Sequence, residues 1–331
     1  MRIGPDGVPS TTAEVSRPLP ADRSAPAPDA GQPWRVAVLG PGGIGGLLAA
    51  LLARDGDRVI CIAPPATATH LREHGIEVRS SRFGSFHVPV DASSRLEAPV
   101  DVCFVAVKAT SLEEALEAVP PATLGKGLVV PFLNGIDHVS VLRRRYPAGQ
   151  VVAATIRIES ARVAPGVIEH PSGFAAAELA PGQADRSRVE QLAARLERTG
   201  MDVRIRDDEK WMLWAKLSIL APIALLGTHE GAPIGVVRER RRDDFAAVVH
   251  EIAEAAKAAD GVDLDPQVPL GMLDQIPAGM RSSMQRDAEA GRPLELDAIG
   301  GTILRAAARG GVQAPVTERL VSEIAARVVS S

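Results

Sequence analysis

Apolar residues in the first half of the chain fall into short runs separated by stretches of helical periodicity. Residues 35–39 and 58–63 are rich in β-branched side chains, which favour strands. Residues 102–107 and 128–133 are apolar almost throughout, as in strands buried on both faces of a parallel sheet. Residues 44–52 instead repeat apolar side chains at helical spacing. The pattern predicts strands and helices in alternation.

Further helices are predicted at 67–74, 112–119 and 136–145, each following one of these strands. Residues 76–79 and 86–90 are expected to pair as a hairpin. Alternating β and α units in one chain form a doubly wound sheet. The expected fold class is therefore α/β, a Rossmann-type doubly wound parallel sheet.

The character of the chain changes near residue 206. Residues 151–205 mix short strand signals with one helix near 186–198, and strand alternation disappears after Asp207. We predict a Rossmann domain over 34–206, followed by an all-α C-terminal domain over 207–331 with helices at 209–226, 242–259, 269–287, 294–309 and 316–329. Residues 1–33 are rich in Pro, Ala and Ser, lack apolar periodicity and contain no apolar signal core. They are expected to be a disordered leader.

Composition narrows the possible partners. The chain of 331 residues has a net charge of −4 with scattered arginines, and only 3% of its residues are aromatic. Neither nucleic acid nor an anionic membrane is expected to bind. The longest apolar runs fall short of the ~20 residues that cross a bilayer, so a soluble cytoplasmic protein is expected. Cys61 and Cys103 lie in predicted strands and are expected to be buried reduced thiols, and His70 with His74 lacks a third metal ligand nearby.

The segment Gly40-Pro-Gly-Gly-Ile-Gly45 carries the clearest chemical signal. It follows a predicted strand and opens a predicted helix, which is the context that a dinucleotide-binding turn requires. Gly40 permits the tight turn, Gly42 the approach of a pyrophosphate, and Gly45 close packing of helix and strand. The amides of Gly43 and Ile44 belong to the helix N-terminus, which favours anions. The alternative is an ordinary glycine-rich turn without a ligand.

The end of the second strand bears on the choice between NADP and NAD. It continues as Ala63-Pro-Pro-Ala-Thr67 and carries no acid to repel a 2′-phosphate. This favours NADPH without excluding NAD. Contacts to the phosphate could come from Thr67, Thr69, His70 or Arg72.

Five short segments, taken in order, resemble the ketopantoate reductase (2-dehydropantoate 2-reductase) family. They are the glycine turn, Val107-Lys108-Ala109, Leu133-Asn134-Gly135, Leu213-Trp-Ala-Lys-Leu217, and Ser282-Ser-Met-Gln-Arg-Asp287 with Glu295-Leu-Asp297. The resemblance implies a Rossmann domain joined to a helical domain, with the active site between them. It also implies NADPH-dependent hydride transfer to a small 2-oxo acid and a place in pantothenate biosynthesis.

The resemblance assigns roles to five residues. Lys108 would contact the cofactor, and Asn134 the nicotinamide ribose and the substrate. Lys216 would be the general acid, Glu295 its partner and a ribose contact, and Ser283 would hold the substrate carboxylate. Physically, a lysine in an apolar helix is costly to bury, so its pKa should be lowered. A cation there also suits an oxygen that becomes negative in the transition state.

Each of these residues has a simpler explanation. Lys108 could be a solvated loop residue, Asn134 a turn residue and Lys216 a lysine that extends its ammonium to water. Glu295 is favoured at a helix start by the helix dipole alone, and Ser283 could be an ordinary helix residue.

The chain departs from the family at four positions. Asparagines of the family are replaced by apolar residues, namely Leu220, Ala224, Ile234 and Met280. A substrate hydroxyl without a partner in an apolar site costs about 1–3 kcal/mol. We therefore expect a 2-oxo acid more apolar than ketopantoate, or polar contacts from Thr228 or His229 instead.

Two other functions are also compatible with the sequence. The same fold could oxidise a hydroxy acid or reduce an imine. The chain could also be a non-catalytic dinucleotide-binding sensor. Its helical domain could support a homodimer or use its apolar surface internally.

Overall fold

The computed structural model describes residues 32–330, with side chains to residue 327. The predicted leader over 1–33 lies almost entirely outside the described residues, and the chain from Pro33 onward packs as one unit.

A five-stranded parallel sheet forms the centre of the first part of the chain. Its order is β5-β2-β1-β6-β7, with β1 at Arg35–Leu39, β2 at Arg58–Ile62, β5 at Asp91–Ser93, β6 at Val102–Val105 and β7 at Leu128–Pro131. The chain moves from β1 outward to β2 and then crosses back over β1 to β6. Ligands of open α/β sheets bind at such a reversal of strand order, which here lies between β1 and β6.

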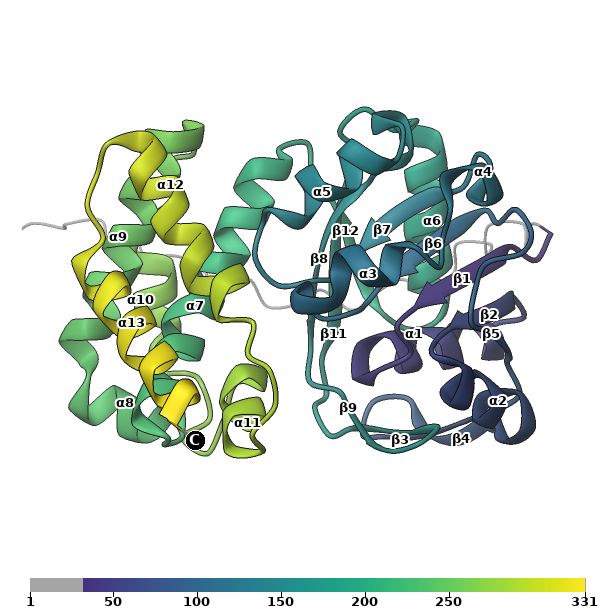
Figure 1. Ribbon diagram of the computed structural model, residues 1–331, viewed down its shortest axis with the longest axis horizontal. Helices are drawn as coiled ribbons and strands as arrows, with labels where there is room; N and C mark the ends of the chain where they lie inside the picture. The colour runs from purple at the N-terminus through teal and green to yellow at the C-terminus, as the bar shows by residue number, and fades with distance from the viewer. Residues whose placement is uncertain (1–31, 331) are drawn as a thin grey trace, which may run out of the picture. The chain divides into compact units, whose positions relative to one another are not determined.

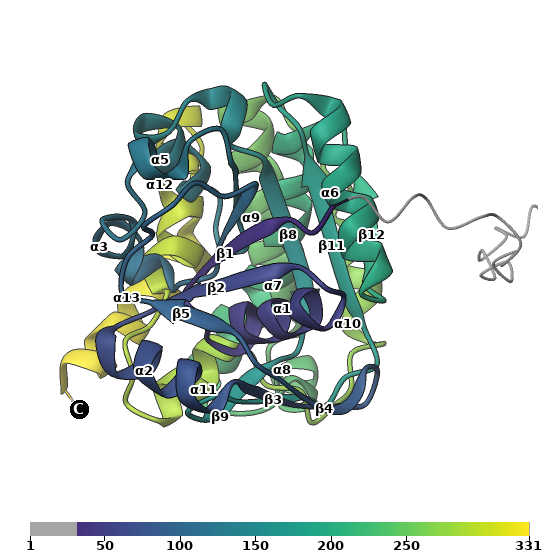
Figure 2. The same ribbon diagram turned by 90° about the vertical axis from the view of Figure 1, so that its right-hand side faces the viewer.

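Helices cover this sheet as predicted. They are α1 (Gly43–Arg54), α2 (Pro65–His74), α3 (Leu112–Leu116), α4 (Pro121–Leu124) and α5 (His138–Arg145), with single turns η1 at Ala109–Ser111 and η2 at Ala148–Gln150. Helix α1 lies against β1 and β2 (Figure 2). Its apolar side chains enter the core, and Leu47, Leu48, Leu51 and Leu52 are each at most 2% exposed. Cys61 and Cys103 are free and buried, which confirms their expected placement.

Two smaller sheets complete the first part. The predicted hairpin is confirmed as β3 (Ile76–Ser80) and β4 (Gly84–Val88), in a sheet of order β4-β3-β10-β9 with β9 at Ala161–Ala164 and β10 at Val167–His170. The other sheet contains β8 (Ala153–Ile158), β11 (Ala175–Ala180) and β12 (Asp202–Ile205), with α6 at Arg186–Arg198. Val152 donates to the carbonyl of Val129 over 3.0 Å, so β8 begins beside β7.

From Glu209 to Ser330 the chain is built of helices and loops, which confirms the all-α C-terminal part. The helices are α7 (Glu209–Glu230), α8 (Ile234–Arg240), α9 (Arg242–Asp260), α10 (Gln267–Leu273), α11 (Ser283–Glu289), α12 (Thr302–Gly310) and α13 (Pro315–Ser330) (Figure 1). The prediction of one helix over 269–287 was wrong, because a loop containing Pro277 and Gly279 separates α10 from α11. The helix predicted from 294 begins later, with a π-helical turn, η3, at Asp297–Gly301.

Helix α7 is the long apolar helix of the described residues. Its 22 residues contain an 18-residue window apolar enough to cross a bilayer by length and composition. Yet 67% of that window is buried inside the protein. The central helix of a packed bundle shows the same pattern.

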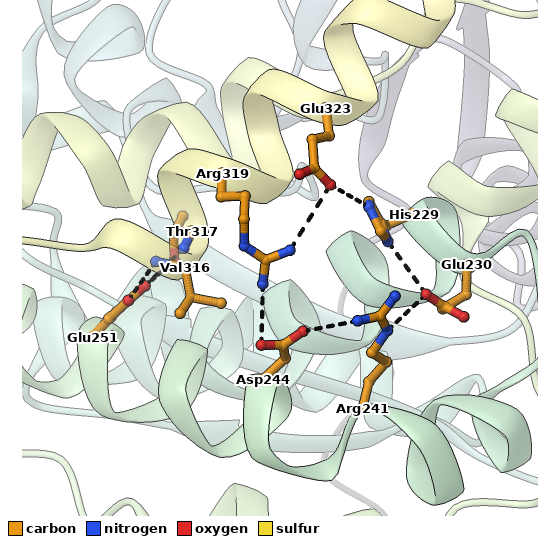
Figure 3. Close-up of polar contacts among 9 residues, drawn as sticks. All are labelled: His229, Glu230, Arg241, Asp244, Glu251, Val316, Thr317, Arg319 and Glu323. Atoms are coloured by element: carbon orange, nitrogen blue, oxygen red, sulfur yellow. Dashed lines mark hydrogen bonds and ion pairs between the residues drawn. The ribbon is translucent and has the colours of Figure 1, made fainter.

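A ring of alternating basic and acidic side chains, here called the charge ring, ties the helices together (Figure 3). His229 and Glu230 end α7, Arg241 and Asp244 lie at the start of α9, and Arg319 and Glu323 lie on α13. The ion pairs run in sequence from His229 to Glu323, Arg319, Asp244, Arg241, Glu230 and back to His229.

A second polar contact joins α9 to α13. Buried Glu251 accepts hydrogen bonds from the amides of Val316 and Thr317, over 2.8 and 2.9 Å, at the first turn of α13 (Figure 3). The carboxylate there satisfies amides that have no partner within the helix.

Candidate functional site

The glycine turn joins the end of β1 to α1. Gly40 has a φ of +85°, which permits the sharp turn, and Gly42 caps the helix. A side chain at Gly45 would overlap the carbonyl of Gly40, so this glycine lets the helix pack on the turn. A side chain at Gly42 would meet nothing within 4 Å. Open space thus lies in front of Gly42, where a pyrophosphate would approach the helix N-terminus, whereas Gly43 is packed against the backbone of Ser160.

Ser160 holds this turn from the other side. Its hydroxyl donates to the carbonyl of Gly43 over 2.8 Å. Ser160 lies two residues after the end of β8, so that strand leads to the opening of α1. The sequence patterns gave no sign of this contact, because it joins residues 117 positions apart.

Glu295 connects the loops after β6 and β7. Its carboxylate accepts from the Ala109 amide and from Nδ2 of Asn134, both over 2.9 Å, and the residue is 8% exposed. Gly135 follows in the second loop with a φ of +79°, and any side chain there would overlap the carbonyl of Ala298 in η3. The carboxyl ends of β6 and β7 therefore meet the segment that leads into α12.

Lys108 lies beside this connection. Its ammonium forms an ion pair of 2.7 Å with Asp287, whose other carboxylate oxygen accepts from Arg292. The Lys108 side chain stays 40% exposed. It is thus both paired and open to solvent.

Lys216 reaches the same region from α7. Its Nζ donates to the carbonyl of Leu133 over 3.2 Å, and the residue is half-buried in an apolar helix. Burial lowers the pKa of Lys216 to about 8; the charge of Glu295 opposes this and that of Arg157 adds to it. Glu295 therefore acts on Lys216 through space. The expectation of a direct pair needs correction, because the Glu295 carboxylate is held by Ala109 and Asn134.

His138 is a nearby residue that the sequence patterns did not single out. It begins α5 and is 4% exposed, and neither ring nitrogen has a hydrogen bond within the described part of the chain. Burial and then the charge of Lys216 lower its pKa to about 3. The imidazole is thus neutral at physiological pH.

Ser283 stands apart from these contacts. It is the exposed first residue of α11, whereas its neighbour Ser282 is buried and caps that helix by accepting from the Gln285 amide over 3.0 Å. Ser283 therefore carries an available hydroxyl, while the hydroxyl of Ser282 serves the helix.

The four apolar replacements divide into two pairs. Ala224 and Ile234 are at most 2% exposed and belong to the core of the helical part. Leu220 and Met280 are partly exposed.

The two alternative polar contacts also differ. His229 is engaged in the charge ring at the end of α7, 13 residues beyond Lys216 and hence about 20 Å along the helix. That distance excludes it as a substrate contact beside Lys216. The Thr228 hydroxyl is buried and lacks a hydrogen bond within residues 32–327.

Two of the residues considered for a 2′-phosphate are engaged elsewhere. His70 contacts the carbonyl of Pro165 over 3.1 Å, and Arg72 donates to Ala92 and to Thr69. Within the described residues, no group of three or more His, Cys, Asp or Glu side chains is placed to hold a metal ion.

Comparison with known proteins gives matches along most of the chain. The family model described as Ketopantoate reductase PanE/ApbA matches residues 36–182, and the model of its C-terminal part matches residues 208–328. The 2-dehydropantoate 2-reductase of Mycobacterium tuberculosis strain H37Rv is 32% identical over 302 residues, which cover 88% of this chain and 97% of that relative.

Solved structures also resemble this chain over most of its length. The 2-dehydropantoate 2-reductase of Geobacter metallireducens GS-15 superimposes with a TM-score of 0.82 at 26% identity, over 88% of this chain and 99% of that one. D-Mandelate dehydrogenase, in a complex with NADH and anilino(oxo)acetate, has the same TM-score at 22% identity, over 89% and 99% of the two chains. The second likeness concerns the fold.

Proposed function

The chain belongs to the ketopantoate reductase family and is an oxidoreductase, and from this premise we propose that it is an NADPH-dependent reductase that transfers hydride to the carbonyl of a 2-oxo acid. The observation that carries the proposal is the meeting of Lys216, Asn134 and Glu295 at the carboxyl ends of β6 and β7. That edge adjoins the reversal of strand order beside the glycine turn, where a dinucleotide is expected.

The glycine turn fits such a cofactor. Gly42 leaves open space at the N-terminus of α1, to which Gly43 and Ile44 belong, and Gly45 lets α1 begin close to the sheet. These residues would hold the pyrophosphate, and Lys108, Asn134 and Glu295 would contact the remainder. When bound, the reduced nicotinamide supplies the hydride.

Lys216 supplies the proton in this proposal. Its ammonium donates a proton to the carbonyl oxygen of the substrate while negative charge develops there. A pKa of about 8 leaves the amine mostly protonated at neutral pH and eases release of the proton. Glu295 favours the charged form of the lysine, and exposed Ser283 would bind the substrate carboxylate.

NADPH is the preferred cofactor in this proposal. The segment after β2 carries no acid against a 2′-phosphate, and Thr67 is available there while His70 and Arg72 are held by other contacts. Titration with NADPH and NADH, followed by cofactor fluorescence, tests this choice. Tighter binding of NADH would contradict it.

The substrate is proposed to be ketopantoate or a more apolar 2-oxo acid. Leu220 and Met280 are the replaced positions that are partly exposed, and an apolar surface there disfavours a substrate hydroxyl. A panel of 2-oxo acids, monitored by reduced-nicotinamide absorbance, tests this. Turnover of ketopantoate well above that of its deoxy branched-chain analogues would contradict the preference for a more apolar acid and identify ketopantoate as the substrate.

We propose that the two parts of the chain have different roles, as the sequence predicted. Residues 34–206 form the dinucleotide-binding domain and residues 207–331 the helical substrate and catalytic domain, in a cytoplasmic enzyme. The separate matches over 36–182 and 208–328 support this boundary.

The proposal predicts the effect of Lys216→Ala. Loss of the general acid should lower turnover of the best 2-oxo acid by about 10²-fold or more, while the Kd for NADPH stays nearly unchanged. Steady-state kinetics and fluorescence titration measure the two quantities. Unchanged turnover would remove Lys216 from the mechanism. Cofactor binding without turnover of any substrate in the wild type would instead indicate a non-catalytic sensor. Hydroxy-acid oxidation or imine reduction without 2-oxo acid turnover would change the chemistry assigned to the same fold.

A further inference from the structure

Arg157 on β8 is a cation beside the site that neither the sequence motifs nor the expected reaction uses. It is exposed, and its guanidinium forms no ion pair or side-chain hydrogen bond with any residue between 32 and 327. Its charge is nevertheless close enough to Lys216 to lower the pKa of that lysine. An arginine next to a catalytic lysine, without an acid of its own, calls for an anionic partner.

The alternation of side chains along β8 fixes the direction of Arg157. Ala154 and Ile156 point into the core of the first part of the chain. Ala153, on the opposite face, packs in one cluster with Met212 and Leu213 of α7. Successive residues of a strand point to opposite faces, so Arg157 shares the face of Ala153. It therefore projects on the side of the strand that α7 covers, the helix that carries Lys216.

The residues that follow Arg157 reach two other parts of the site. Ser160 bonds the carbonyl of Gly43 at the opening of α1. Glu159, just beyond the end of β8, lies 3.9 Å from Arg286 of α11, the helix that begins with Ser283. Arg157 thus lies between the glycine turn, the helix of Ser283 and Lys216.

The charged groups near Arg157 favour the binding of a further negative group. Lys216 and Arg157 carry two positive charges, and Glu295 supplies one negative charge. Glu159 is already next to Arg286. Arg157 thus keeps a positive charge that no ion pair among residues 32–327 neutralises, and the carboxylate of a 2-oxo acid can bind it.

We propose that Arg157 binds the carboxylate of the substrate together with Ser283 and determines the preference of the enzyme for 2-oxo acids over uncharged carbonyl compounds. The guanidinium can form two parallel hydrogen bonds to a carboxylate, which orients the adjacent carbonyl oxygen. Lys216 then meets that oxygen from α7. The inference rests on the proposed function, because it assumes a 2-oxo acid as substrate.

The test compares a branched-chain 2-oxo acid with its methyl ester in the wild type and in Arg157→Gln and Arg157→Lys. In Arg157→Gln, kcat/KM for the acid should fall about 10- to 100-fold, while that for the ester changes less than about 2-fold. Arg157→Lys should be intermediate, because lysine keeps the charge and loses the planar fork. Arg58→Gln is the control, since Arg58 is also exposed but lies at the start of β2, away from the carboxyl ends of the five-stranded sheet. It should match the wild type.

Two further measurements test whether lost carboxylate binding causes the lower kcat/KM of Arg157→Gln. Binding of oxamate to the enzyme–NADPH complex should weaken by the same factor in Arg157→Gln, with the Kd for NADPH unchanged. The basic limb of the pH profile with the ester should move to higher pH, because removal of a neighbouring positive charge raises the pKa of Lys216.

The outcomes distinguish a failure of this inference from a failure of the proposed function. Equal losses for acid and ester, or unchanged kinetics with the acid, would overturn the role of Arg157 and leave the reductase proposal intact. A wild type that reduces only the ester and does not bind oxamate would overturn both.

Discussion

At the scale of single residues, the pKa of Lys216 is determined by the groups around it. The apolar helix around it lowers the pKa of its ammonium to about 8, Glu295 stabilises the charged form and Arg157 destabilises it. None of these effects requires a direct contact with either partner. The amine is therefore adjusted by burial and by two charges of opposite sign.

This arrangement predicts the pH dependence of the reduction. The general acid must carry its proton, so kcat/KM should be constant below about pH 8 and should fall above it, approaching tenfold per pH unit. Rates measured between pH 6 and pH 10, with substrate well below KM, test this. A profile flat to pH 10 would show that a group with an ordinary lysine pKa, or none at all, supplies the proton.

At the scale of elements, the turn between β1 and α1 gives each glycine a different task. Gly45 is required by packing, since a side chain there would overlap the carbonyl of Gly40. Gly42 faces open space with a φ of −82°, which other residues also adopt. Two glycines of one motif thus serve the fold and the ligand separately.

Alanine substitutions should separate the two tasks. Gly45→Ala should destabilise the protein by about 1–3 kcal/mol through overpacking, measured as a lower midpoint of urea unfolding. Gly42→Ala should unfold like the wild type but bind NADPH about tenfold more weakly, because its methyl group enters the space before the helix. Normal cofactor binding by Gly42→Ala would place the pyrophosphate elsewhere.

At the scale of the whole described chain, the segment 287–295 joins the sheet to the helical part. Asp287 pairs with Lys108, and Glu295 holds the loops after β6 and β7. These contacts place residues of the first part beside Lys216 of α7. They therefore assemble the site as well as connect the two parts.

Glu295→Gln should reveal both effects. An amide offers one acceptor oxygen where the carboxylate serves two donors, so unfolding should become easier by about 1–3 kcal/mol. Loss of the negative charge should also lower the pKa of Lys216 further and move the basic limb of the pH profile to lower pH, opposite to Arg157→Gln.

The control is Asp297→Asn, two residues along the same segment. The Asp297 side chain is 82% exposed and pairs with Arg305 at the surface, so its loss should cost less than about 1 kcal/mol. Equal effects of the two substitutions on stability and on the pH profile would show that Glu295 has no special role in joining the parts.

The sequence alone determined strands β1, β2, β6 and β7 with the helices that follow them, the glycine turn and the change to an all-helical second part. These features depend on local periodicity and on residues close together in the chain. The helix that the sequence pattern predicts over residues 269–287 was wrong, because Pro277 and Gly279 interrupt a run with helical spacing.

The motifs also indicated Lys216, Asn134 and Glu295, but not how they connect. Only the tertiary structure decided that Glu295 bonds Asn134 and Ala109 rather than Lys216, and that His138 and Arg157 lie near that lysine. These contacts join residues far apart in the chain, and no local pattern records which distant side chains meet when β8, α5 and α7 pack together.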